Sequence, residues 1–216
     1  MILIYADSGV STDCVLALQD YFKNKAKLVF AEDIIKTDWL DLDSTQLLIM
    51  PGGKSKPFYD KLGNTGNQNI INFVKSGGNY LGLCAGAYYA SAQTIFAKNL
   101  PLEIILSGEL NFFPGEAIGP VFNPEKFAYQ SEAGADILTI QFGSEQYCIY
   151  NNGGCYFKDP ENFSNISILA TYENNLAAII ECKVGKGKAV LCGVHPELSL
   201  GKNKEKCMQK LLFDFL

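Results

Sequence analysis

The chain has 216 residues, 48% of them hydrophobic, and a formal net charge of −5, which is typical of a globular protein with a substantial core. The acidic balance lacks the basic surface of a nucleic-acid-binding protein, and no apolar run approaches the roughly 18–20 residues that cross a bilayer. The amino terminus also lacks the basic region of a secretion signal. We therefore expect a cytoplasmic protein that binds neither nucleic acid nor membrane.

The first half of the chain alternates short apolar runs with amphipathic segments. The strands are expected at residues 1–6, 27–31, 46–50 and 79–84, and the helices at 11–24, 67–78 and 85–97. The strand segments are continuously apolar, which predicts a parallel sheet covered on both faces. The fold class that follows is α/β, with a mostly parallel sheet flanked by helices as in flavodoxin-like proteins.

The second half has a different composition. Between about residues 105 and 165 the chain is rich in Gly, Pro, aromatic residues and Asn, which predicts antiparallel additions to the parallel core. Strands are expected at 136–142, 146–152, 166–172, 177–184 and 187–194, followed by an amphipathic helix at 203–216. No linker or repeat interrupts the sequence, so residues 1–216 are interpreted as a single domain.

The seven cysteines include no C-x-x-C pair, and most of them stand in apolar runs. This pattern indicates buried, reduced thiols rather than disulfides. A single histidine and scattered cysteines also lack the ligand spacing of a zinc site. The sequence therefore predicts no metal site and no cofactor.

One cysteine stands in a different context. Cys84 lies in the segment LGLCAGA, where a predicted strand meets a predicted helix. The pattern G-x-C-x-G at such a junction is the cysteine form of a nucleophile elbow, and the start of the helix favours thiolate. The alternative is a small core residue at a tightly packed corner, and the pentapeptide alone does not distinguish the two.

The only histidine of the chain supplies the base that a nucleophilic thiol needs. His195 follows the last predicted strand, at the sheet edge where open parallel sheets place their sites. Glu197 stands two residues on, and in an extended segment the two side chains would share a side, with Pro196 holding the backbone extended. The carboxylate would then orient the imidazole toward the thiol. The alternatives are a surface histidine or a core histidine with its hydrogen bonds satisfied, and a glutamate that caps a helix or is simply exposed.

The segment IMPGGK follows the strand at 46–50 and ends at the same edge. Its glycines allow a backbone N–H to point into a site without a side chain in the way. Gly53 and Ala85 are therefore the expected donors of an oxyanion hole. The alternative is an ordinary glycine turn.

The combination of PGG, GLCAGA and HPE, in that order, resembles the class I glutamine amidotransferase-like family. LLIMPGG, GNYLGLCAGAYYAS, GELNFFPGEAIGPVF, YNNGGCYF, ATYE and KVGKGKAVLCGVHPE are similar to the amino-terminal domain of eukaryotic biotin-protein ligases and its free-standing bacterial relatives. The resemblance implies Cys84 as nucleophile, His195 as base and Glu197 as the orienting acid, with the amides of Gly53 and Ala85 as oxyanion donors.

The chain departs from these families at two points. The glutamine of the pattern G-x-C-x-G-x-Q is replaced by Tyr88, which argues against free glutamine as the substrate. The glycine- and arginine-rich loop that binds biotinyl-adenylate in the ligases is absent, so we expect no ligase activity from this chain by itself.

The resemblance and the residues together predict a small-molecule partner. We expect hydrolysis of a carbon–nitrogen bond in a small amide or peptide-like substrate, through a thioester on Cys84. A binding module without catalysis and a redox-sensing cysteine are the alternatives, and a protein partner or homo-oligomer stays open. Candidate pocket residues are Gly52, Lys54, Tyr88, Asn111, Asn152 and Tyr156. The segments around Asn111 and Tyr156 are expected either to wall the pocket or to pack Phe112 and Phe113 against the core.

Overall fold

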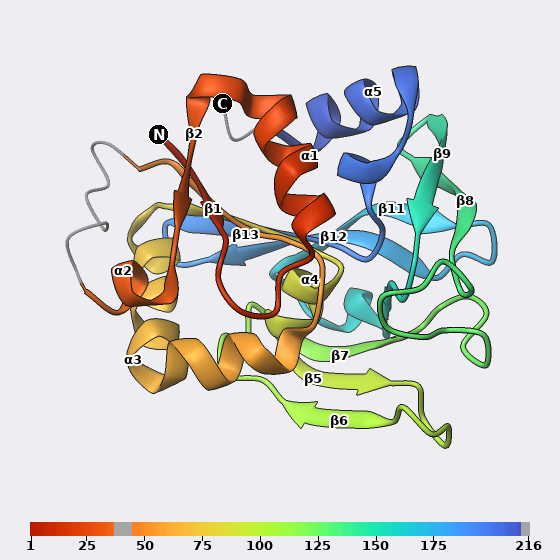
Figure 1. The fold of residues 1–216 in the computed structure, drawn as a ribbon, viewed down its shortest axis with the longest axis horizontal. Helices are drawn as coiled ribbons and strands as arrows, with labels where there is room; N and C mark the ends of the chain where they lie inside the picture. The colour runs from red at the N-terminus through yellow and green to blue at the C-terminus, as the bar shows by residue number, and fades with distance from the viewer. Residues whose placement is uncertain (37–44, 213–216) are drawn as a thin grey trace.

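The computed structural model describes residues 1–36 and 45–212 (Figure 1). Its centre is a run of five parallel strands in the order β2-β1-β3-β4-β13. These strands are β1 (Ile2–Tyr5), β2 (Ala26–Val29), β3 (Leu47–Met50), β4 (Asn79–Leu83) and β13 (Gly187–Cys192). The three central ones, β1, β3 and β4, are buried over almost their whole length, as their continuously apolar sequences predict.

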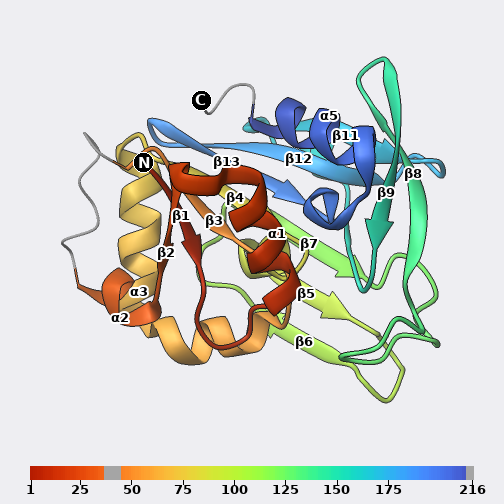
Figure 2. The same cartoon turned by 45° about the horizontal axis from the view of Figure 1, so that its top comes forward.

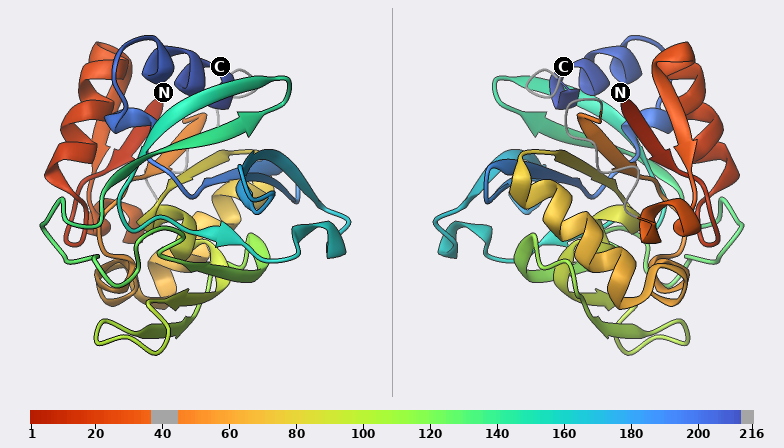
Figure 3. Two further views of the ribbon diagram at one scale, coloured as in Figure 1. Left: turned by 90° about the vertical axis from the view of Figure 1, so that its right-hand side faces the viewer. Right: turned by 90° about the vertical axis from the view of Figure 1, so that its left-hand side faces the viewer.

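Helices cover both faces of this parallel core, as Figures 2 and 3 show. The side chains of α1 (Thr12–Phe22) and α5 (Gly201–Leu212) pack on one face. Those of α2 (Ala31–Ile35), α3 (Ser55–Ser76) and α4 (Ala85–Tyr89) pack on the other. The result is a helix–sheet–helix arrangement that leaves the carboxyl ends of the strands open to loops.

Antiparallel strands extend the sheet beyond β13. The extension continues with β12 (Ala177–Val184), β10 (Tyr156–Phe157), β7 (Phe113–Gly119), β5 (Ser91–Phe96) and β6 (Ile104–Ser107), of which β5 and β7 are parallel to each other. A branch from β12 consists of β11 (Ile166–Tyr172), β8 (Asp136–Phe142) and β9 (Glu145–Asn151). Short 3-10 turns form at η1 (Lys23–Lys25), η3 (Pro160–Asn162) and η4 (Pro196–Leu198).

The predicted α/β architecture, a parallel core with antiparallel additions in the second half, is confirmed. Two predicted helices differ from the structure, and one observed helix was not predicted. The helix predicted at 85–97 is wrong, because α4 ends at Tyr89 and residues 91–96 form β5, which pairs with β6 and β7. The helix predicted at 67–78 begins twelve positions earlier, at Ser55, and α2 was not predicted. The last four residues of the helix predicted at 203–216 lie outside the described residues.

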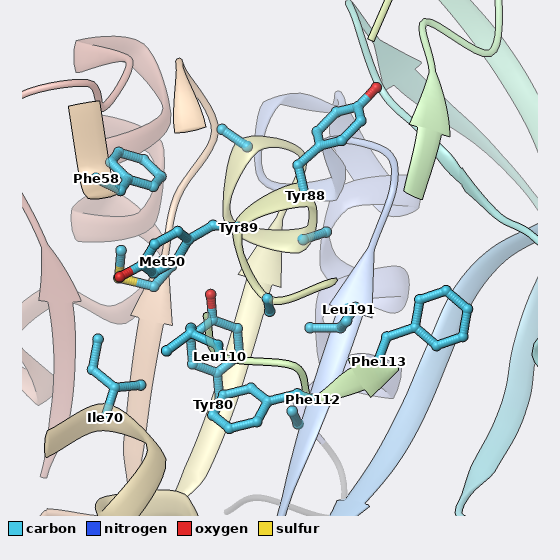
Figure 4. Packing of buried hydrophobic residues seen from close by; sticks show 14 of the residues in the cluster. Met50, Phe58, Ile70, Tyr80, Tyr88, Tyr89, Leu110, Phe112, Phe113 and Leu191 are labelled. Atoms are coloured by element: carbon cyan, nitrogen blue, oxygen red, sulfur yellow. The ribbon is translucent and has the colours of Figure 1, made fainter. Parts of the chain in front are cut away.

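Aromatic side chains pack the face that α3 and α4 cover (Figure 4). Phe112 and Phe113 are buried there, and the ring of Phe112 lies edge-on to Tyr80 with their centroids 5.2 Å apart. Of the two alternatives for this segment, packing of Phe112 and Phe113 against the core is therefore the one observed for these two residues. Their burial attaches the second half of the chain to the parallel core through apolar contact area.

The corner between β4 and α4 depends on two glycines. A Cβ added at Gly86 would lie 2.1 Å from the Met50 carbonyl oxygen, and one added at Gly82 would lie 2.6 Å from the Gly86 carbonyl oxygen. Both contacts involve backbone, which cannot rotate away. Glycine at these positions lets α4 pack directly on β3 and β4, and this close approach fixes the position of Cys84 between them.

No helix among the described residues is both long enough and apolar enough to cross a membrane.

Replacing Gly86 with Ala should destabilise the fold by about 2–4 kcal/mol, because the new methyl group overlaps the Met50 carbonyl. The measurement is urea unfolding followed by circular dichroism. Gly201→Asn is the matched control, since no atom lies within 4 Å of a Cβ at Gly201 and Asn tolerates its φ of 58°. Equal stability of the Gly86→Ala protein and the wild type would contradict the steric role of Gly86.

Candidate active site

The carboxyl ends of β3, β4 and β13 lie side by side. Met50 pairs in register with Gly82, and Leu83 with Cys192. The backbone N–H of Cys84 continues the ladder, donating to the Cys192 carbonyl oxygen at 2.8 Å. The three loops that leave these strands therefore converge at one edge of the sheet, as the sequence predicted.

Cys84 occupies the elbow between β4 and α4. Its backbone has φ 45° and ψ −100°, a conformation that residues other than glycine rarely adopt. Strain of this kind costs about 1–3 kcal/mol and tends to occur at functional sites. The side chain is 5% exposed and reaches the wall of a pocket. The helix that starts at this corner, α4, has 5 residues and is much shorter than the predicted one.

His195 is held in place by the β8–β9 branch. Its backbone N–H donates to the Tyr150 carbonyl oxygen at 2.9 Å, and the Ser199 hydroxyl donates to the His195 carbonyl oxygen at 3.1 Å. The Tyr150 N–H in turn donates to the same hydroxyl at 3.0 Å, and the Tyr150 and His195 rings lie edge to face with centroids 5.9 Å apart. The position of the imidazole therefore depends on the second half of the chain.

A short hydrogen bond joins the His195 ring to Glu197. The distance from His195 Nδ1 to Glu197 Oε1 is 2.8 Å, and Glu197 is fully buried. The predicted pairing is confirmed, but the extended backbone that was to produce it is wrong. Pro196–Leu198 form the 3-10 turn η4, with His195 as its N-cap. The turn brings the Glu197 carboxylate within hydrogen-bond distance of the His195 ring.

The charges around His195 favour its protonated form. Burial by itself lowers the pKa of the imidazole, but the negative charges of Cys84 and Glu197 outweigh it and raise the pKa above the ordinary 6.5. The Cys84 charge also acts on Tyr129, whose pKa is raised first by burial and then by that charge.

Cys14 also lies against His195, and sequence reasoning did not identify it. Its Sγ lies 3.7 Å from His195 Nδ1, and the side chain is buried in the first turn of α1. Gly52 fits beside both groups, because a Cβ there would lie 2.3 Å from His195 Cε1 and 3.0 Å from Cys14 Sγ. Gly52 therefore makes room for the ring. This role differs from the predicted one, in which Gly52 would line the substrate pocket.

These groups open onto a pocket of about 700 Å³, a volume typical of small-molecule sites. Its lining includes Cys84, His195 and Cys14, together with two of the predicted pocket residues, Lys54 and Asn152. The outer wall is the segment 127–132, where Lys54 Nζ lies 4.4 Å from the centre of the Tyr129 ring. The Asn152 side chain holds this segment by donating to the Ser131 carbonyl oxygen at 3.0 Å.

The other predicted pocket residues have different surroundings. The buried Tyr88 hydroxyl donates to the Gly153 carbonyl oxygen at 3.1 Å, so Tyr88 joins α4 to the loop after β9. Figure 4 shows Tyr88 and Tyr89 pointing to different sides of α4, with Tyr89 toward Phe58. Asn111 is exposed in the loop before β7, with φ 50°. Tyr156 lines a separate hollow on the extension of the sheet.

The two predicted oxyanion donors flank Cys84. Gly53 lines the pocket, and Ala85 is the first residue of α4. Neighbouring bonds join Ser11 N–H to the Gly52 carbonyl oxygen and Lys54 N–H to the Gly9 carbonyl oxygen, which fixes the loop on both sides of Gly53. Within the described part of the chain, the N–H groups of Gly53 and Ala85 have no protein acceptor.

Solved structures with a similar fold include glutamine amidotransferases. One has a TM-score of 0.67 at 19% identity, with 97% of each chain covered. A second, from Thermotoga maritima, has a TM-score of 0.54 at 16% identity, covering 99% of this chain and 82% of that one. The fold is therefore that of the class I glutamine amidotransferase-like proteins.

The particular family follows from the sequence comparisons. Residues 1–213 match the family described as "Biotin-protein ligase, N terminal", and the chain belongs to that family. It is 37% identical to the biotin–protein ligase of Schizosaccharomyces pombe (strain 972 / ATCC 24843), over 98% of this chain but only 36% of the ligase. It is 34% identical to an uncharacterized protein of Chlamydia muridarum (strain MoPn / Nigg), over 91% of this chain and 80% of that protein.

His195 should titrate above the ordinary pKa of 6.5, because the negative charges beside it stabilise the imidazolium. It is the only histidine of the chain, so its ring resonances can be followed by NMR without assignment ambiguity. Cys84→Ala and Glu197→Gln each remove a negative neighbour and should each lower the midpoint, whereas Cys148→Ser, at an exposed thiol, should leave it unchanged. A midpoint at or below 6.5 in the wild type would contradict this electrostatic account.

Proposed function

We propose that the chain is a cysteine amidohydrolase that cleaves a carbon–nitrogen bond in a small amide or peptide-like substrate. One observation carries the proposal. The Cys84 thiol and the His195 imidazole line the same pocket, and Glu197 Oε1 lies 2.8 Å from Nδ1 of that imidazole. Nucleophile, base and orienting acid are the three parts that acyl transfer requires.

The reaction begins with a proton transfer. Glu197 accepts the hydrogen bond from His195 Nδ1, so Nε2 is the nitrogen that takes the proton of Cys84. The thiolate attacks the substrate carbonyl carbon, and the oxygen that becomes negative is stabilised by the N–H groups of Gly53 and Ala85. His195 then gives its proton to the leaving nitrogen as the carbon–nitrogen bond breaks, leaving a thioester on Cys84. Water, deprotonated by His195, hydrolyses the thioester and restores the thiol.

The pocket favours a small polar substrate. Its lining combines the cation of Lys54, the carboxylates of Asp13 and Glu132, and the ring of Tyr129. Tyr88 stands where glutaminases of this class carry glutamine, and its hydroxyl is used in the bond to the Gly153 carbonyl oxygen. Free glutamine is therefore not the substrate that we propose. Biotin attachment is not proposed either, because residues 1–216 contain no glycine- and arginine-rich loop of the kind that binds biotinyl-adenylate in the ligases.

Thiol alkylation at mildly acidic pH tests the activated cysteine. Cys84 should react with iodoacetamide at least about tenfold faster than the exposed Cys148, because a thiolate paired with imidazolium persists where an ordinary thiol is protonated. Mass spectrometry of the labelled peptides reports both sites in one sample. His195→Ala should remove the advantage of Cys84. Labelling of Cys84 that is slower than Cys148 in the wild type would favour a binding module without catalysis.

A screen of small amides and short peptides for release of ammonia or amine tests the reaction itself. Cys84→Ala should lower any turnover by about 10³-fold or more. Glu197→Gln should lower it by about 10²–10⁴-fold, because a glutamine amide can leave the imidazole in the wrong tautomer.

The matched control for the second variant is Glu116→Gln, which makes the same chemical change at a carboxylate paired with Lys158 away from the pocket. Turnover that survives in Cys84→Ala would refute the mechanism. Reversible oxidation of Cys84 by peroxide, with no amide cleaved in the screen, would instead assign the thiol to redox sensing.

A further inference from the structure

Beside the predicted nucleophile, the structure holds a second group of ligating atoms. Cys14, His195 and Glu197 each offer one atom, and the three atoms lie within 4.8 Å of one another. All three side chains are buried. The cluster unites residues from the two ends of the chain, which is why the sequence spacing gave no sign of it.

The donor set is that of a borderline transition metal. One thiolate, one imidazole and one carboxylate are the ligand types of Zn²⁺, which binds sulfur at about 2.3 Å and nitrogen at about 2.0–2.1 Å. Around one tetrahedral ion these bond lengths place sulfur and nitrogen about 3.6 Å apart. The observed distance between Cys14 Sγ and His195 Nδ1 is 3.7 Å, so that pair needs no rearrangement.

The Glu197 carboxylate also has an oxygen atom that is free to bind a cation. Glu197 Oε1 accepts the hydrogen bond from the imidazole, while Oε2 is buried and, among the residues described, has no hydrogen-bond partner. A buried charged oxygen without a partner is costly, and a bound cation would offset that cost. The open side of the cluster faces the pocket, since Cys14 and His195 both line it. An ion therefore has a path in, and the pocket leaves a position for water or a further ligand.

We propose that Cys14, His195 and Glu197 form an inhibitory site for Zn²⁺ on the reverse side of the catalytic imidazole. Zinc binds His195 through Nδ1 and displaces the proton shared with Glu197, and the Cys14 thiol loses its proton to become the sulfur ligand. The proton displaced from Nδ1 and the proton of Cys14 pass to solvent, and Nε2 takes up one proton from solvent, so the imidazole stays neutral with its proton on Nε2. That nitrogen can no longer accept the proton of Cys84, so zinc removes the base without touching the nucleophile.

The inhibitory effect rests on the proposed function, but occupation of the site does not. We therefore test the site with Co²⁺, which takes the place of Zn²⁺ and gives a thiolate-to-cobalt charge-transfer band in the near ultraviolet. All proteins carry Cys148→Ser, since Cys148 is the only exposed thiol among the seven. The band should appear in this background and persist with Cys84→Ala added. It should disappear with Cys14→Ser, and Zn²⁺ should displace the cobalt wherever the band is seen.

Cys14→Ala provides a second variant should Cys14→Ser fail to fold, with circular dichroism as the check. Absence of the band in the folded background protein would overturn the site. A band that is lost with Cys84→Ala and kept in the Cys14 variants would overturn it too, because the sulfur ligand would then be the nucleophile.

Once the screen has identified an amide that the protein cleaves, Zn²⁺ should inhibit the wild type reversibly. The activity should recover when a chelator is added. The Cys14→Ala enzyme should need at least about tenfold more zinc for the same inhibition. Equal zinc sensitivity of the two enzymes would overturn the inhibitory role. Because the cobalt band needs no turnover, failure of the amide screen would leave that measurement decisive for the site.

Discussion

The hydrogen bond between His195 Nδ1 and Glu197 Oε1 is the interaction on which the candidate site depends. Both side chains are buried, and a buried carboxylate is retained only where a partner offsets its desolvation. An ionised Glu197 can only accept, so Nδ1 carries the proton in this bond, and Nε2 is the nitrogen that serves Cys84 in the proposed mechanism. The tautomer of one histidine therefore links the fold to the proposed chemistry.

The two halves of the chain contribute differently to that arrangement. The parallel core supplies Cys84 and the glycine loop, because β3 and β4 end at the same edge. The antiparallel branch restrains the histidine through the Tyr150 backbone, and Ser199, which follows η4, adds a hydrogen bond from its hydroxyl. The irregular composition of residues 105–165 thus has a role in holding the site, beyond the burial of aromatic side chains.

Two side chains, those of Glu197 and Cys14, crowd the Nδ1 atom of His195. Glu197 and Cys14 approach the same nitrogen of His195, the first as an acceptor of its proton and the second as a soft ligand at 3.7 Å. Proton and metal compete for one lone pair in such an arrangement. Gly52 leaves the space in which these groups meet.

The sequence by itself determined the parallel core and the positions of Cys84, His195 and Glu197 along it, because apolar runs and glycine corners are local signals and parallel strands bring their carboxyl ends together. Only the tertiary structure decided the rest. Residues 91–96 follow a helix-like pattern but pair as β5 with strands that come later in the chain. Cys14 meets a histidine 181 positions away. Both outcomes depend on contacts between distant segments, which no local pattern encodes.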